Sequence, residues 1–410
     1  MNRNKFIIFF AILCLLFLFL ISTRKLNETS RLELKEPQWK FYVLDNKSAS
    51  RFVDLSYDLN NNPHIFFFAE RTREGLKQIY SNNTLEDYYY NDRNWKTESL
   101  DNKRESGFFV SSLTVNDTIK LCYMDYEVGN EKLYIASLKG NTFKKKIVDD
   151  KTKSGLSAGM YCSLICHENQ SYVFYYVEEG KKFVMQDINS KLIKILDYNA
   201  GRQISAEHYQ DKVYVAYKGR DDMHLRFGIY DLKTQSWSHK KYPINVTSLD
   251  LAIFNGSPYI TYYNKDDKGI YFTNALNFNP IKIANGFMSV IAMDANHQNL
   301  YIAYFIERKG LFLAKTNDGQ SFEVQQIDDN PNAGEFLDLK VTPNDDIKIA
   351  YLDKTFLRYA EFERSSYLLM RRNKELQTYI YRVSANISLV TLLVLILFLI
   401  GPTKIAQQKN

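Results

Sequence analysis

The stretch YVFYYVE, residues 172–178, is one of seven similar aromatic segments in a chain of 410 residues. The other six are HIFFFAE (64–70), KLCYMDY (120–126), VYVAYKG (213–219), YITYYNK (259–265), YIAYFIE (301–307) and KIAYLDK (348–354). Their equivalent aromatic residues follow one another at intervals of 42 to 56 residues: Phe67, Tyr123, Tyr175, Tyr217, Tyr262, Tyr304 and Tyr351. A repeat of this length is typical of β-propellers and solenoids.

Each aromatic segment lies within a unit of four short strands. A strand with a polar end precedes it, as in FVDLSYDLN (52–60) and VIAMDAN (290–296), and a charged loop leads on to a third strand, such as KLYIASLKG (132–140). A fourth strand completes the unit, such as NWKTESLDN (94–102). The aromatic strand is apolar on both faces, which is typical of a strand buried between stacked sheets. Four antiparallel strands in a repeat of this size predict one propeller blade.

The two ends of the repeat region complement each other. The seventh unit has no fourth strand of its own, whereas QWKFYVLDN (38–46) precedes the first unit and matches the fourth strands of the others. We expect it to pair with FLRYAEFER (356–364), so that the last blade has no bare edge. The sequence therefore predicts an all-β fold over residues 37–364. Its form is a seven-bladed β-propeller of four-stranded antiparallel blades, closed by the N-terminal strand.

Two apolar segments flank this domain as N- and C-terminal transmembrane helices. FIIFFAILCLLFLFLI (6–21) follows a basic N-terminus and predicts a signal anchor or a signal peptide over residues 6–22, with an uncleaved anchor favoured. Residues 383–401 are apolar enough and long enough to cross a bilayer as a helix. Residues 365–382 carry an apolar stripe with basic residues elsewhere, which predicts a juxtamembrane amphipathic helix, either continuous with the span or lying in the interface.

These spans set the expected topology. Residues 1–5 and the tail 402–410 are expected in the cytosol, residues 23–36 form a linker, and the propeller lies on the extracytoplasmic side. The basic residues that precede the second span argue weakly against this orientation. A large folded domain after the first helix favours it.

Composition excludes several classes of function. A net charge of +6 is mild for this length, and no basic block is interleaved with aromatic residues as a nucleic-acid surface requires. The six histidines lack the spacing of a zinc site, and we expect neither a metal nor a cofactor. Outside the first helix only Cys122, Cys162 and Cys166 remain. This odd number favours buried thiols, and a disulfide between Cys122 and one of the others stays open.

The segment TNDGQSF (316–322) resembles the Asp-box turn of sialidase-like (BNR-repeat) propellers, which joins the third and fourth strands of a blade. It is one residue shorter than that motif, and LKGNTF (138–143) and LKTQSW (232–237) occupy the equivalent turn without its Asp. The resemblance covers residues 51–364 and implies a propeller. The arginine-bearing motif of sialidases has only RFVD (51–54) as its nearest counterpart, which is not a match. The resemblance therefore implies the architecture and not the sialidase activity.

Charged loops join the second and third strands of almost every unit, and we expect them at one rim of the central channel. Such a rim suits a polar ligand or a partner of complementary charge, and solvated hairpin tips are the alternative. Paired acids are what a glycosidase or a calcium site requires, although neighbours on one turn normally point apart. The candidate ligand-binding residues are Arg220, Asp221, Asp222, Asp266, Asp267 and Arg308, and we assign no catalytic and no metal-binding residue.

These features predict a membrane-anchored binding or scaffold module. Its expected partners are the lipid bilayer and a protein or glycan at the rim, and an enzyme is the less favoured class. Two alternatives stay open. A sialidase-like hydrolase or lyase would need two carboxylates and a basic cluster converging in the channel mouth. A structural subunit of a membrane complex would pack its two helices against other chains.

Overall fold

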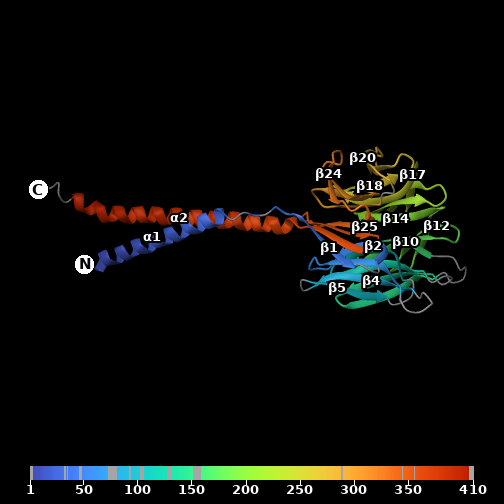
Figure 1. Ribbon diagram of the computed structural model, residues 1–410, viewed down its shortest axis with the longest axis horizontal. Coiled ribbons are helices and arrows are strands. Elements are labelled where there is room, and N and C mark those ends of the chain that lie inside the picture. Colours follow the sequence, from blue (N-terminus) through green and yellow to red (C-terminus); the bar gives the residue numbers. More distant parts are fainter. Residues whose placement is uncertain are drawn as a thin grey trace. The chain divides into compact units, whose positions relative to one another are not determined.

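The computed structural model describes residues 3–31, 34, 36–45, 49–72, 81–91, 94–101, 106–126, 131–150, 158–287, 290–343, 345–354 and 356–405. They divide into two compact units. One unit, Trp39–Phe362, contains all the described strands, and the other, Met1–Gln38 with Glu363–Asn410, contains both long helices (Figure 1).

The described strands form five four-stranded sheets and one seven-stranded sheet, all antiparallel. Sheet 1 contains β2 (Ala49–Tyr57), β3 (Pro63–Thr72), β4 (Ser81–Asn91) and β5 (Asn94–Asp101). Sheet 2 contains β6 (Ser106–Val115), β7 (Thr118–Asp125), β8 (Lys132–Lys139) and β9 (Thr142–Asp149). Sheet 3 contains β10 (Ala158–His167), β11 (Gln170–Val177), β12 (Lys182–Asp187) and β13 (Ile193–Tyr198).

Sheet 4 is the seven-stranded one. It contains β14 (Ala200–Tyr209), β15 (Lys212–Gly219), β16 (His224–Asp231), β17 (Trp237–Phe254), β18 (Ser257–Asn264), β19 (Gly269–Asn274) and β20 (Ile281–Asn285). Sheet 5 contains β21 (Ile291–Ala295), β22 (Leu300–Ile306), β23 (Gly310–Thr316) and β24 (Glu323–Asp328). Sheet 6 contains β25 (Ala333–Val341), β26 (Ile347–Asp353), β27 (Phe356–Phe362) and the N-terminal β1 (Trp39–Asp45).

The long strand β17 is a departure from the predicted four-stranded units. Its first half pairs with β16 as far as Asn245, and its second half pairs with β18 from Val246 onward. One strand therefore serves as the last strand of one unit and the first strand of the next. The turn that separates such strands elsewhere is absent here because the chain passes straight through.

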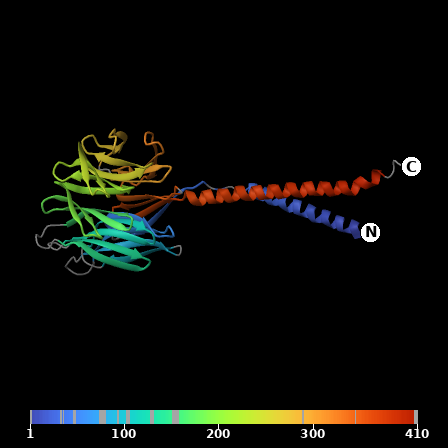
Figure 2. The same ribbon diagram turned by 180° about the vertical axis from the view of Figure 1, so that it is seen from behind.

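Face-to-face packing of the sheets explains why the aromatic strands are apolar on both faces. The seven equivalent aromatic residues are at most 2% exposed, as the repeat pattern predicts. Sheets 1 and 2 share a core around Phe66 and Leu121, and sheets 6 and 1 share one around Leu352 and Leu55. Figure 2 shows the sheets stacked one against the next.

Four of the buried tyrosines also carry a hydrogen bond across the sheet boundary. Each hydroxyl donates to an aspartate on the last strand of the preceding sheet, which satisfies a polar group that burial would otherwise leave unpaired. The pairs are Tyr123 with Asp101 (2.8 Å), Tyr175 with Asp149 (3.0 Å), Tyr217 with Asp197 (3.0 Å) and Tyr351 with Asp328 (2.7 Å). For Tyr217 the preceding sheet is sheet 3, and for Tyr351 it is sheet 5.

The N-terminal strand pairs as the sequence predicts. β1 is antiparallel to β27, with Trp39 opposite Phe362 and Tyr42 opposite Tyr359. The rings of both pairs are in contact, with centroids 5.5 Å and 5.9 Å apart. The first and last strands of the domain therefore belong to one sheet.

The predicted turn and thiols take local roles. Asp318 of TNDGQSF accepts hydrogen bonds from the backbone N–H groups of Gln320 (2.8 Å) and Ser321 (2.9 Å), so its carboxylate caps the turn between β23 and β24. The cysteines of the described chain are free, and Cys122 and Cys162 are buried, as expected of small apolar side chains.

The helical unit contains α1 (Arg3–Ser30) and α2 (Arg364–Ile405), which run antiparallel (Figure 1). Both are long and apolar enough to cross a membrane. The two helices contact each other, and Ser22 Oγ lies 3.0 Å from Ser384 Oγ. The expected linker begins as a continuation of α1 to Ser30, and the expected juxtamembrane helix and span are one continuous helix.

Candidate functional site

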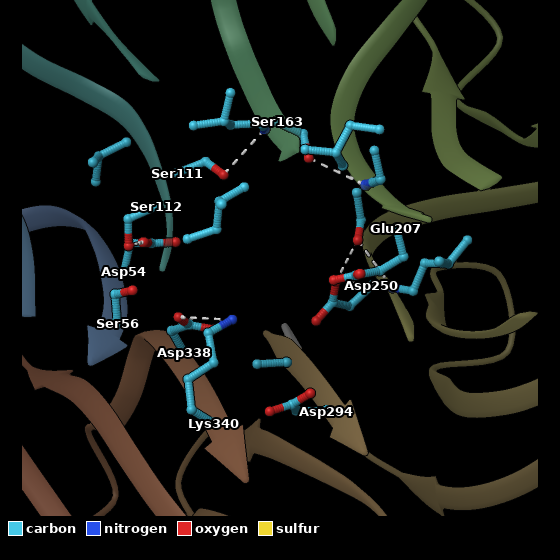
Figure 3. Close-up of a pocket in the computed structure, with 18 of the residues that line it drawn as sticks. Asp54, Ser56, Ser111, Ser112, Ser163, Glu207, Asp250, Asp294, Asp338 and Lys340 are labelled. Atoms are coloured by element: carbon cyan, nitrogen blue, oxygen red, sulfur yellow. Dashed lines mark hydrogen bonds and ion pairs between the residues drawn. The ribbon is translucent and has the colours of Figure 1, made fainter. Parts of the chain in front are cut away.

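A cavity of about 1230 Å³ runs along the first strands of the units. Its walls come from β2, β6, β10, β14, the second half of β17, β21 and β25. Figure 3 shows side chains from all sides of the domain pointing into this common space. The first strands of the units thus surround one common space, called the channel below.

Polar side chains in the channel hold neighbouring first strands together. These strands belong to different sheets, or to different halves of sheet 4, and share no backbone ladder within the described chain. A side-chain oxygen on one strand instead accepts a hydrogen bond from a backbone N–H of the next. The pairs are Ser111 with Leu164 (3.4 Å), Ser163 with Ala206 (3.2 Å), Ser205 with Leu251 (3.1 Å), Asp250 with Met293 (2.7 Å), Asp294 with Val341 (2.7 Å) and Asp338 with Leu55 (2.7 Å).

Asp54 occupies the corresponding place between sheets 1 and 2, where the Ser112 hydroxyl donates to it. The carboxylates of Asp250, Asp294 and Asp338 also accept from the N–H of the residue that follows each of them, at 2.8 Å. Both oxygens of these three carboxylates are therefore engaged in holding the backbone. Their first role is structural.

The channel is strongly acidic. Five carboxyl groups face its interior and a sixth, the exposed Glu168, lies at the asparagine mouth beside Asn169, whereas Lys340 is the single lysine or arginine among the described residues that line it. The Lys340 ammonium lies 3.8 Å from Asp338. The interior carboxyl groups belong to Asp54, Glu207, Asp250, Asp294 and Asp338.

Crowding of these acids perturbs their protonation. Burial, reinforced by the nearby Asp338, raises the pKa of Asp54 to about 8, and burial raises the pKa of Asp250 to about 6. Burial alone would lower the pKa of Lys340, but the surrounding carboxylates, Asp338 first, raise it instead. The channel therefore titrates across the neutral range while Lys340 stays charged.

Glu207 differs from the other channel acids. Its side chain stands out into the channel, where water reaches it, and the described structure gives it no hydrogen-bond partner. Because protein surrounds it on all sides, burial raises its pKa to about 7, with Lys340 opposing this. Among the interior carboxyls it is the one for which the described residues provide no hydrogen-bond partner.

The two ends of the channel differ in chemistry. Exposed Asn61, Asn116 and Asn169 lie at the turns between the first and second strands and form a polar mouth. Phe52, Phe109 and Tyr161 lie near the starts of their strands, where each occupies a bulge with positive φ. The ring centroids of Phe52 and Phe109 are 4.5 Å apart, and those of Phe109 and Tyr161 are 4.4 Å apart. An aromatic cluster therefore lies at the end of the channel away from the asparagines.

The six predicted rim residues lie at the end of the channel opposite the asparagine mouth. The loop after β15 is beside the start of β14, because Gly219 pairs with Ala200. Arg220 donates to Glu178 (2.6 Å), Asp221 (2.8 Å) and the Tyr176 hydroxyl (3.1 Å), which connects sheets 3 and 4. These residues contribute none of the described channel lining.

The paired acids of the rim point apart, as adjacent residues on a turn are expected to. Asp221 binds Lys181 at 2.8 Å, whereas Asp222 binds Arg226 at 3.0 Å. Despite partial burial, Lys241 and Arg226 hold the pKa of Asp222 at about 2. Asp267 binds Lys282 at 3.2 Å, and Asp266 accepts from Asn245 at 3.2 Å. The structure therefore does not bring these four acids together.

The last predicted residue, Arg308, is 88% exposed and lies 3.8 Å from Glu307. Within the described residues no group of three or more His, Cys, Asp or Glu side chains is arranged to hold a metal ion.

The rim near β15 carries unbalanced positive charge. Lys218 is 7% exposed, and the described structure gives its ammonium no anionic partner. Burial, with Arg202 and Lys265 nearby, lowers the pKa of Lys218 to about 8. Arg202 pairs with Lys218 across the strands and lies over the Tyr176 ring at 5.9 Å. This basic group at the rim is therefore distinct from the acids, which lie inside the channel.

Comparison with known proteins supports the fold but does not identify a function. No family model matches the chain, and no curated protein matches it by sequence. Among solved structures, an ulvan lyase, a polysaccharide lyase, is 10% identical with a TM-score of 0.54 over 81% of this chain and 99% of the lyase. The BP39L lectin from Burkholderia pseudomallei is 10% identical with a TM-score of 0.53 over 79% of this chain and 97% of the lectin.

A subtype N11 neuraminidase-like protein from a flat-faced bat isolate is 14% identical over 81% of this chain and 95% of its own. Its TM-score is 0.47. At such identities the two better matches bear on the fold alone. The stacked antiparallel sheets and these matches show an all-β chain with a β-propeller fold and two apolar terminal helices.

Proposed function

We propose that this chain is a membrane-anchored, closed, seven-bladed β-propeller on the extracytoplasmic side, and that its channel binds a neutral or amine-bearing glycan. The division of β17 between two units supports seven blades. Two contacts support ring closure. The hydrogen bond from Leu55 N–H to Asp338 joins sheet 1 to sheet 6, and the β1–β27 pairing joins the first strand of the domain to the last.

The choice of ligand rests on the carboxylates of the channel. Five acids around one lysine make a negative potential that opposes a sialic acid or uronate carboxylate. Serine hydroxyls, mouth asparagines and the unengaged Glu207 instead suit a ligand rich in hydroxyl or amino donors. Because Asp250, Asp294 and Asp338 already accept backbone hydrogen bonds, we favour binding over hydrolysis.

The matching experiment is a glycan array probed with the full-length chain in detergent. We expect binding to neutral or amino-sugar oligosaccharides and none to sialylated or uronate oligosaccharides. At pH 8, where Glu207 with its pKa of about 7 is mostly ionised, Glu207→Gln should weaken binding about tenfold, since a hydrogen bond to a charged group contributes about 1.5–3 kcal/mol. The matched control is Glu323→Gln on the exposed outer strand β24, which should bind normally.

Binding of anionic glycans only, or an unaffected Glu207→Gln variant, would overturn this assignment. Release of new reducing ends that Glu207→Gln abolishes would favour the glycan-acting hydrolase instead.

The orientation in the membrane has its own test. Lys233→Cys places a thiol at a side chain that is 74% exposed on the propeller, and Gln408→Cys places one in the C-terminal tail. A membrane-impermeant maleimide should label Lys233→Cys in intact cells and Gln408→Cys only after permeabilisation. The reverse pattern would place the propeller in the cytosol. The parent chain, in which Cys122 and Cys162 are buried, Cys166 is partly exposed and Cys14 is exposed on α1, gives the background that is subtracted.

A further inference from the structure

Lys218 departs from the repeat pattern at a buried position. It directly follows Tyr217, and the residues that follow the equivalent aromatics of the other units are large and apolar or aromatic. These residues, all at most 5% exposed, are Phe68, Met124, Tyr176, Tyr263, Phe305 and Leu352. Lys218 is itself only 7% exposed. One unit therefore encloses a charged side chain where the others enclose an apolar one.

The charge of Lys218 is not compensated by the protein. Among the described residues Lys218 has no hydrogen-bond or ion-pair partner, and it lies opposite Arg202 in the β14–β15 ladder. Burial, followed by Arg202 and the nearby Lys265, lowers the pKa of Lys218 to about 8, and no acid opposes this shift. Like charges opposite one another across a ladder are destabilising, and a buried charge without a partner is costly. The structure therefore lacks an anion at this place.

Arg202 is a second cation in the same position. Its guanidinium lies over the Tyr176 ring, 5.9 Å from the centroid, and its Nε is buried without a hydrogen-bond partner in the described structure. Buried donors are normally paired. Two cations on adjacent strands thus both have hydrogen-bonding capacity that the described residues do not use.

The nearest acids are engaged with other cations. Glu178 accepts a hydrogen bond from Arg220 at 2.6 Å, and Arg202 acts on it only through longer-range attraction. Asp222, on the loop after β15, is paired with Arg226 at 3.0 Å. A rotation of either acid toward the two cations would break these contacts. An anion from outside the chain does not have this cost.

The two cations are accessible to such an anion. Arg202 is half-buried and Lys265 is exposed, so this part of the rim is open to solvent on their side. The Lys218 ammonium retains contact with solvent, since it is unpaired but is not one of the unpaired polar atoms that the described structure buries completely. A small anion can therefore reach both side chains.

An aromatic wall adjoins the cations. Burial raises the pKa of Tyr161, and the nearby Arg202 opposes this shift, which places the Tyr161 hydroxyl within the field of the guanidinium. The Tyr161 ring in turn contacts Phe109, with centroids 4.4 Å apart. Rings beside a basic pair suit the organic part of an anionic ligand.

We propose that Lys218 and Arg202 bind a phosphate dianion, free or as a monoester, with the ammonium and the guanidinium donating to its oxygens. A lysine serves phosphate as a point charge, and the arginine fork can contact two of its oxygens. Two adjacent cations are balanced by two negative charges. A phosphate monoester carries nearly two at pH 7, whereas a carboxylate or a phosphodiester carries one.

Calorimetry on the full-length chain in an uncharged detergent at pH 7, without phosphate in the buffer, tests the proposal. Inorganic phosphate and phenyl phosphate are separate probes, and acetate and dimethyl phosphate, each with a single negative charge, are controls. We expect at least one phosphate probe to bind about tenfold more tightly than either control. Tighter binding of phenyl phosphate would indicate an organic monoester as the source, and equal or tighter binding of inorganic phosphate would indicate free phosphate.

Two variants assign the binding to this part of the rim. Lys218→Met keeps the fold, because Met124 occupies the equivalent position in sheet 2. It should weaken phosphate binding about tenfold or more, while the melting temperature without ligand stays the same or rises. Arg202→Gln should weaken binding several-fold. Lys144→Met, which changes an exposed residue of β9, is the matched control and should bind as the parent does.

The proposal is wrong if neither phosphate probe binds, if acetate or dimethyl phosphate binds as tightly, or if Lys218→Met and Arg202→Gln both retain the parent's affinity. A Lys218→Met chain that melts well below the parent would also contradict it, since the protein would then already compensate the Lys218 charge. None of these results bears on glycan binding in the channel.

Discussion

Deletion of residues 37–46 should lower the melting temperature of the propeller by more than about 10 °C, measured by circular dichroism on the detergent-solubilised chain. The deletion removes β1 and leaves β27 with an unpaired edge. It also removes Trp39 and Tyr42, whose rings pack on Phe362 and Tyr359. Losing a strand and two large side chains costs roughly 5 kcal/mol or more, and each kcal/mol shifts the melting temperature of a domain this size by about 2–4 °C.

The control for this deletion is removal of residues 1–36, which takes away α1 but keeps β1. That chain should melt close to the parent temperature. If the two deletions melt alike, β1 contributes nothing particular to the propeller and ring closure through it is refuted.

Replacement of Lys340 by Met should destabilise the propeller by about 3–5 kcal/mol at pH 8, because it leaves the channel carboxylates without their cation. The loss should be smaller at pH 5. The pKa values of Asp54 (about 8), Glu207 (about 7) and Asp250 (about 6) lie above those of unfolded acids. The folded state therefore binds more protons than the unfolded state between pH 4 and pH 8.

With that sign, stability falls as pH rises through this window, in the parent and more steeply in Lys340→Met. Urea unfolding at pH 5, 6.5 and 8 measures the slope. Lys282→Met, which breaks an exposed pair with Asp267, should change stability by less than about 1 kcal/mol at every pH. A Lys340→Met variant with the parent's stability at pH 8 would mean that the carboxylates are neutral there or compensated by other groups.

The repeat pattern predicted most of the fold because its signal is local. Alternation, turn residues and the apolar faces of segments such as YVFYYVE depend on neighbours in sequence, and burial between sheets follows from them. The pairing of β1 with β27 was also accessible, since one unit lacked a strand and another strand had no unit. The continuous strand β17 was not, because TQSWSHKKYPINVTSLD contains a proline that suggests a break.

The candidate site was harder to predict. The charge of the rim loops predicted a binding site there. In the structure, however, Asp221, Asp222 and Asp267 are each paired with a lysine or arginine. The channel acids were visible as a recurring Asp or Ser in the first strands, in FVDLSYD and FLDLKVT among others, but sequence gives no sign that these positions face one axis.

The hydrogen bonds between first strands have a consequence for how such a protein can diverge. Asp and Ser do the same mechanical work at these positions, but Asp adds a charge that Ser does not, as Ser163 and Asp250 illustrate. Each exchange between the two therefore alters the potential that a visiting molecule meets while leaving the ring of strands intact. Homologous chains can therefore differ in the charge of the ligand that the channel favours while keeping the same fold, provided that Lys340 or an equivalent cation balances the number of acids.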